Sequence, residues 1–147
     1  FLDTSSLKNI LMFLRDEVSK DSNWRVQEVL AKSFDEFCKI IGYEKALPVI
    51  DDWLKNSNHN TRRAVTEGLR IWTGRPYFKA NPNEAIRRLA ALRDDPSEYV
   101  RKSVGNALRD ISKKYPELIR VELSTWSLET KGIKQVYQLA NKLLIKS

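Results

Sequence analysis

Charged side chains recur at helical spacing in three segments of the sequence, and these residues have the types and positions to do chemistry. The three stripes are Glu28-Lys32-Asp35, Arg63-Glu67-Arg70 and Lys102-Asn106-Arg109. Residues four and seven apart lie on one face of an α-helix, so each stripe forms one polar face. Ion pairs between residues four apart would explain such a face without any ligand. A groove that follows a phosphate backbone would also explain why long basic side chains recur at corresponding positions of two helices.

The sequence contains no pattern for metal or nucleophile chemistry. Its single cysteine, Cys38, and its single histidine, His59, belong to no cluster with the spacing of metal ligands. We find neither a glycine-rich phosphate loop nor a Ser/His/Asp or Cys/His arrangement. We therefore expect no metal and no cofactor.

The three stripes belong to segments that align as copies of one helix, residues 23–30, 60–69 and 98–108. A repeat of roughly 33 to 40 residues is one helix pair long and is typical of an α-solenoid, in which each pair buries its apolar face against its neighbours. We predict an all-α fold, an α-α superhelix of about eight helices. Its core positions are Val26, Thr61 and Val100, then Leu30, Val65 and Val104, then Phe34, Leu69 and Leu108. The concave side is expected to carry Arg63, Glu67, Arg70, Lys102, Asn106 and Arg109.

Length and composition set the broad class of the protein. A chain of 147 residues is expected to form a single domain, 1–147, and its net charge of +7 makes a polyanion a reasonable partner. Cys38 cannot form an internal disulfide, and we find neither a signal peptide nor an apolar run near the ~18 residues of a membrane span. We expect a cytoplasmic monomer that does not bind membranes. Residues 2–20 predict a helix that needs a partner on its N-terminal side, so we expect that a tag, a processed segment or upstream repeats are missing from the sequence.

Proline and aromatic residues predict local features of the helix pairs. Pro48 is tolerated in the first turn of a helix, so we expect that helix to start at Ala46 or Leu47, or to be kinked. A longer loop is expected at 73–81, anchored by its aromatic residues or inserted into a groove. Trp24, at the start of its helix, fits either a place in the core or a place in a functional site.

Three stretches carry a resemblance to a known family. Residues 94–114, followed by Pro116, are similar to the AlkC branch of the HEAT-like repeat DNA alkylation-repair proteins. The stretch Thr66–Arg70 resembles the acidic helix motif of that branch. Trp53-Leu54, followed by Arg62-Arg63-Ala64, resembles the AlkD branch. The resemblance extends from Asn23 to Trp126 and implies a superhelix of HEAT-like repeats.

The resemblance implies a DNA glycosylase that excises cationic alkylated purines from double-stranded DNA. The reaction suits a carboxylate, which stabilises an oxocarbenium-like sugar and positions water, and an aromatic ring, which attracts the cationic base. The matching motif positions imply four catalytic candidates, Trp24, Glu28, Glu67 and Asp110. The residues implied to contact DNA are Arg62, Arg63, Arg70, Arg101, Lys102, Asn106 and Arg109.

Two departures from the family pattern keep alternatives open. Glu28 stands where the AlkD branch has Asp, and Asn106 stands where that branch has a second aromatic residue. One alternative is a non-catalytic protein that binds duplex or branched DNA through backbone contacts. The other is a HEAT-repeat scaffold that binds an acidic protein.

Overall fold

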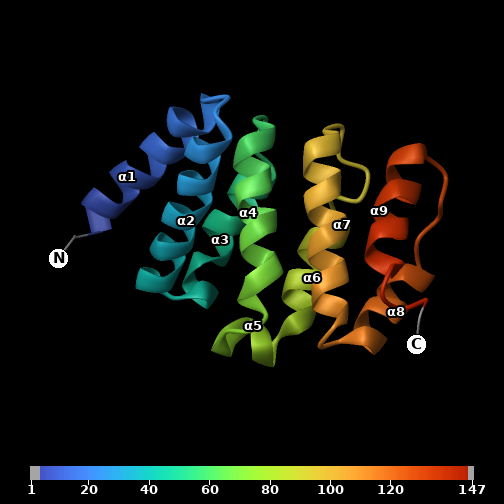
Figure 1. Ribbon diagram of the computed structural model, residues 1–147. Helices are drawn as coiled ribbons and strands as arrows, with labels where there is room; N and C mark the ends of the chain where they lie inside the picture. Colours follow the sequence, from blue (N-terminus) through green and yellow to red (C-terminus); the bar gives the residue numbers. More distant parts are fainter. Residues whose placement is uncertain (1–3, 146–147) are drawn as a thin grey trace. The chain divides into compact units, whose positions relative to one another are not determined.

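The computed structural model describes residues 4–145, and its described part contains helices and no strand (Figure 1). The predicted all-α class is therefore confirmed. The chain forms two compact units, Phe1–Gly68 and Leu69–Ser147, with the boundary inside helix α4. Within the described residues, no helix has the length and apolar character needed to cross a membrane.

The first unit is built from helices joined by very short connections. It contains α1 (Thr4–Asp16), the 3-10 helix η1 (Val18–Lys20), α2 (Trp24–Ile41), α3 (Tyr43–Leu54) and the part of α4 (His59–Trp72) that ends at Gly68. Gly42 alone separates α2 from α3 and has a φ of 91°, a conformation that glycine adopts without steric cost. Leu30, Phe34 and Trp53 are buried in this unit, and the rings of Phe34 and Trp53 stack with centroids 4.1 Å apart.

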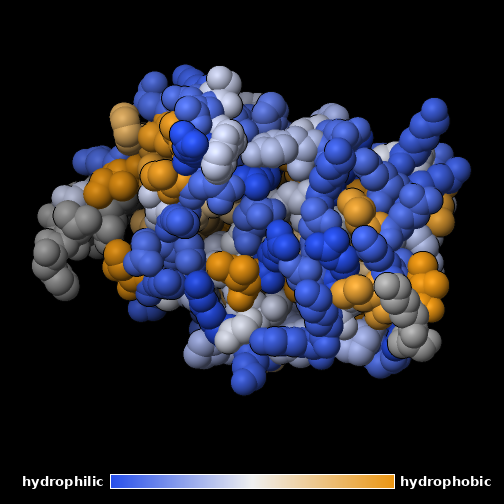
Figure 2. Space-filling view, in the orientation of Figure 1, coloured by the Kyte–Doolittle hydropathy of each residue, from blue (hydrophilic) through white to orange (hydrophobic). Residues whose placement is uncertain are grey.

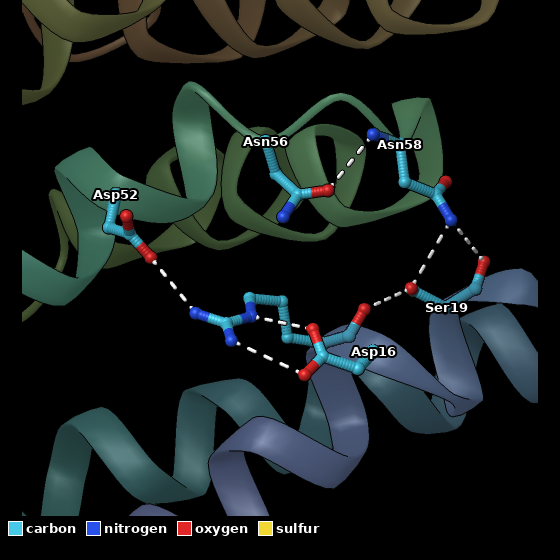
Figure 3. A network of polar contacts seen from close by, with 6 residues as sticks. Asp16, Ser19, Asp52, Asn56 and Asn58 are labelled. Carbon is cyan, nitrogen blue, oxygen red and sulfur yellow. Dashed lines mark hydrogen bonds and ion pairs between the residues drawn. The ribbon is translucent and has the colours of Figure 1, made fainter.

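A polar network fixes the end of α1 and the loop before α4 (Figure 3). Ser19 is fully buried, and its hydroxyl donates to the carbonyl of Arg15. The Asn58 amide donates to the carbonyl and hydroxyl oxygens of Ser19, each at 3.2 Å. Arg15 also pairs with Asp16 at 2.8 Å and with Asp52 at 3.4 Å. These contacts hold the end of α1 and the segment after it against the loop before α4 and against Asp52 of α3.

The second unit is also built from helices packed against one another. After the last turn of α4 it contains α5 (Pro76–Ala80), α6 (Pro82–Ala90), α7 (Glu98–Ser112), α8 (Pro116–Ser124) and α9 (Lys131–Asn141). Helices α7 and α9 pack side by side (Figure 1). A Cβ on Gly105 would lie only 2.7 Å from the Leu139 Cβ, so this glycine allows the close approach of α7 to α9.

Aromatic residues anchor the segment after α4 onto the second unit. The predicted loop at 73–81 contains the short helix α5, and Phe78 of this helix is fully buried against Trp72, with ring centroids 5.7 Å apart. The anchoring role of these rings is confirmed. Trp126 is also buried, and its indole N–H donates to Glu122 at 2.8 Å.

Two local predictions differ from the structure. Helix α3 starts at Tyr43 and not at Ala46 or Leu47, so Pro48 lies inside it, and the alternative of a kinked helix stays a prediction. The Gly42 carbonyl accepts from Ala46 N at 2.9 Å, which starts the helix before the proline is reached. The first predicted helix is also shorter, because α1 ends at Asp16 and η1 follows.

The core alignment is largely confirmed. Of its nine positions, Val26 alone is half-buried and the other eight are buried. Gln27 beside it is buried because its amide donates to the carbonyls of Val18 and Asp21, which binds η1 to α2.

In the view of Figure 2 the surface is mostly hydrophilic, with apolar patches beside α1 and α2. Ile10, Val29 and Ile40 are exposed and line a groove of about 320 Å³ between α1 and α2.

Candidate functional site

Trp24 lies on the surface of the first unit, at the start of α2. Asn23 caps this helix by accepting a hydrogen bond from Arg25 N at 2.9 Å, which fixes the first turn. The indole is 66 % exposed, so Trp24 is not a core residue. The guanidinium carbon of Arg25 lies 5.2 Å from the centroid of the ring, within the range of a cation-π contact. The indole ring of Trp24 therefore already contacts a cation, the guanidinium group of Arg25, in this structure.

Glu28 lies one helical turn after Trp24 and forms part of an ion-pair cluster. Arg63 of α4 contacts Glu28 Oε1 at 3.2 Å through Nη1 and Glu67 Oε1 at 3.7 Å through Nη2. We name these residues the Glu28-Arg63-Glu67 triad. Its two carboxylates share one guanidinium, so the triad as defined carries a net charge of −1. In a chain with a net charge of +7, the triad as defined is locally acidic.

Asp110 forms a second cluster, in the second unit and of opposite sign. Its carboxylate accepts a hydrogen bond from Arg70 Nε and lies 3.5 Å from Arg109 Nε and 3.7 Å from Lys113 Nζ. We name Arg70, Arg109, Asp110 and Lys113 the Asp110 cluster, whose net charge as defined is +2. Burial raises the pKa of the Asp110 carboxyl, but the hydrogen bond and charge of Arg70, with the charges of Lys113 and Arg109, outweigh it. The pKa is therefore lowered from the ordinary value of 3.8.

Two arginines predicted to contact DNA are bound to loops of their own unit. Arg62 is buried, and its Nη1 donates to the carbonyls of Asn56 at 2.9 Å and Ser57 at 3.0 Å. Arg101 Nη1 donates to the Asp95 carbonyl at 2.7 Å. Both guanidinium groups thus hold the loop that precedes their own helix, while their contact with DNA stays a prediction.

The two other predicted DNA contacts lie on α7. Lys102 is exposed and pairs with Glu98, one turn earlier, at 3.0 Å. Asn106 is half-buried. Their contact with DNA stays a prediction, as does the position of the stripes Arg63-Glu67-Arg70 and Lys102-Asn106-Arg109 on a concave side.

The structure adds residues that the sequence interpretation missed. Lys113 joins Asp110 because it lies three residues later, at the C-cap of α7, a spacing that the stripe pattern could have included. Arg25 was missed because its contact is with the adjacent ring of Trp24 and not with a residue four positions away. Across residues 4–145, no group of three or more His, Cys, Asp or Glu side chains is arranged to hold a metal ion.

Comparison with known proteins gives a consistent assignment. The family model described as "DNA alkylation repair enzyme" matches residues 4–125. The crystal structure of AlkD2 from Streptococcus mutans matches with a TM-score of 0.90 and 76 % identity, over 92 % of this chain and 65 % of that chain. The Pseudomonas fluorescens alkylpurine DNA glycosylase AlkC, bound to DNA with an abasic site analog, matches with a TM-score of 0.66 and 25 % identity, over 99 % of this chain and 48 % of that chain.

One curated relative also matches. The uncharacterized protein YhaZ of Bacillus subtilis (strain 168) is 36 % identical over 91 residues, which are 59 % of this chain and 26 % of YhaZ. The chain thus spans about a quarter of this curated relative and about two thirds of AlkD2.

Proposed function

The chain belongs to the DNA alkylation repair enzyme family, and we propose that the protein binds double-stranded DNA and excises cationic alkylated purines from it. The observation that carries this proposal is the exposed ring of Trp24 one helical turn before Glu28, a carboxylate of the locally acidic triad in a basic protein. The similarity to AlkC, an alkylpurine DNA glycosylase, supports the same reaction class.

The proposed reaction is hydrolysis of the N-glycosidic bond. Alkylation places a positive charge on the purine ring, and cleavage returns the C1′–N electron pair to the base, which leaves neutral. The sugar then carries oxocarbenium character at C1′, water adds to this carbon, and the water loses a proton. The products are the free base, an abasic site and a proton.

In this reaction the carboxylate of Glu28 stabilises the positive charge that develops on the sugar. A carboxylate near C1′ stabilises the oxocarbenium electrostatically and accepts the hydrogen bond of the attacking water. Trp24 presents a π-face to the cationic base, as it does to Arg25 in this structure. Arg63 holds the carboxylates of Glu28 and Glu67, so both are oriented before substrate arrives.

A non-catalytic DNA-binding protein is the second candidate. It is favoured by the ion pairs of all three candidate carboxylates, because each of Glu28, Glu67 and Asp110 already contacts a guanidinium group. In that case the clusters would only hold helices together, and the surface cations would bind phosphates without chemistry.

The two candidates are separated by measuring DNA binding and base release with the full-length protein. Duplex binding should weaken steeply with salt, because each phosphate contact contributes about 0.9 to the slope of log K against log salt. Methylated duplex should release free methylpurine bases if the first candidate is correct. Tight binding with no release would favour the second candidate, and binding that does not change with salt would reject both.

Two finer predictions belong to this proposal. We propose that the protein acts as a monomer in the cytoplasm, where genomic duplex would be its substrate. Light scattering of the free protein tests the first point, and a mass of two or more copies would contradict it.

A further inference from the structure

The Asp110 cluster differs from the Glu28-Arg63-Glu67 triad in the sign of its charge. Asp110 lies within 4 Å of three cationic side chains, Arg70, Arg109 and Lys113. A positively charged sugar or base approaching Asp110 would meet these cations as well and would be repelled. An anion would be attracted, because the positive charges outnumber the negative one. The Asp110 cluster therefore suits a different ligand from the triad.

The side chains of this cluster have the chemistry that binds phosphate. Guanidinium groups match the geometry of phosphate oxygens and form charge-assisted hydrogen bonds with them. The side chain of Arg70 is one third exposed and that of Lys113 is 63 % exposed, so both reach solvent from the cluster. Arg70 extends from the last turn of α4, and Lys113 is the residue that directly follows α7.

We propose that Arg70, Arg109 and Lys113 bind one phosphate of the DNA backbone and that Asp110 holds these three cations together and is not the carboxylate of the reaction. This proposal rests on the function proposed above. Like charges repel one another, so three cations stay together at this distance only if an anion lies between them. Asp110 supplies that anion in the free protein. Lys113 becomes a DNA contact that the sequence pattern did not include.

A structural explanation competes with this proposal. Cations in the last turn of a helix are favourable beside the negative end of the helix dipole, so the cluster could serve only to stabilise α4 and α7. The two explanations differ in what happens when a cation is removed. A structural cluster loses stability and leaves the salt dependence of DNA binding unchanged, whereas a phosphate site loses a DNA contact.

The experiment measures binding of an undamaged duplex to the full-length protein by fluorescence anisotropy over a series of salt concentrations. Lys113→Gln is the main variant, because the side chain is exposed and its loss does not endanger folding. Arg70→Gln tests the guanidinium. The matched control is Lys134→Gln, which removes an exposed cation of α9 in the same unit, outside the cluster.

The expected result is a salt slope that falls by up to about 0.9 in each cluster variant and stays unchanged in the control. Asp110→Asn should weaken duplex binding by up to about tenfold, because without the anion the three cations repel one another and no longer stay together at the phosphate. Its single-turnover rate of base release at saturating protein should stay close to the wild-type rate.

Either of two results would overturn the proposal. The first is a salt slope that both cluster variants leave unchanged. The second is a loss of about 10²-fold in the release rate of Asp110→Asn, which would make Asp110 the carboxylate of the reaction. If the wild type binds duplex and releases no base, the proposed reaction fails, while the salt slopes still decide the phosphate site.

Discussion

Replacing Glu28 by Gln tests the role of the triad directly. The change keeps the shape of the side chain and removes its charge, so the cluster of Glu28, Arg63 and Glu67 changes from a net charge of −1 to zero. The side chain of Glu28 is 48 % exposed, so the effective dielectric constant around its carboxylate lies between that of the protein interior and that of bulk water. The loss of charge should slow base release and leave the fold intact.

The size of the effect follows from Coulomb's law. A carboxylate about 4 Å from a developing unit charge contributes about 1 kcal/mol in water and about 4 kcal/mol at an effective dielectric constant near 20. Each 1.4 kcal/mol is about tenfold in rate, so a half-exposed Glu28 should contribute on the order of 10²-fold. DNA binding should be equal or tighter, because a charge of the same sign as phosphate is removed.

The assay is single-turnover release of N7-methylguanine from duplex DNA with the protein in excess. Glu36→Gln is the matched control, because Glu36 is an exposed carboxylate on the same helix whose ion pair is with Lys39 at 3.1 Å. The control should keep the wild-type rate. Wild-type rates in Glu28→Gln and in Glu67→Gln alike would refute the assignment of the chemistry to the triad.

Three further predictions follow from the structure. Trp24→Ala should slow base release by roughly 2- to 30-fold, the range of a cation-π contact, and Trp24→Phe should keep more of the rate. Neither change should lower the melting temperature much, because Trp24 is exposed. Equal release rates in both variants and the wild type would contradict this prediction. Gly105→Ala should destabilise the protein by about 1–3 kcal/mol in denaturant titrations, because its Cβ would meet Leu139 at 2.7 Å. Gly74→Ala, with neighbours no closer than 3.5 Å, should be close to neutral, and an equal loss in both variants would refute the packing argument. The ionised carboxylate of Asp110 stabilises the fold at pH values above its ordinary pKa of 3.8, and this stabilisation is lost as the pH falls through the lowered pKa of the folded protein. Melting curves between pH 7 and 3 should therefore show a steeper loss of stability with falling pH for the wild type than for Asp110→Asn.

Much of the fold could be predicted because helical repeats leave a periodic apolar pattern. Leu30, Val65 and Val104 occupy one aligned position, and all three are fully buried. The details that could not be predicted depend on polar contacts that the apolar pattern does not show. The buried Gln27 donates to the carbonyls of Val18 and Asp21, and no periodicity of apolar residues signals such a contact.

The sequence predicts which residue types form the candidate site, but it does not predict which of these residues form ion pairs with one another. The stripes identified Arg63 and Arg70 on one helix, yet the structure pairs the former with Glu28 and the latter with Asp110. Ion pairs between helices form where packing brings side chains together, and spacing along one helix does not reveal them. The opposite charges of the two clusters follow from these pairings.

The central claim is that the triad and Trp24 act on a cationic leaving group. The most direct test compares release of N7-methylguanine, a cationic base, with release of hypoxanthine, a neutral one, from the same position of one duplex by the full-length protein. We predict release of the cationic base, dependent on Glu28, and no detectable release of the neutral base. Equal release of both bases, or tight duplex binding with release of neither, would contradict the claim.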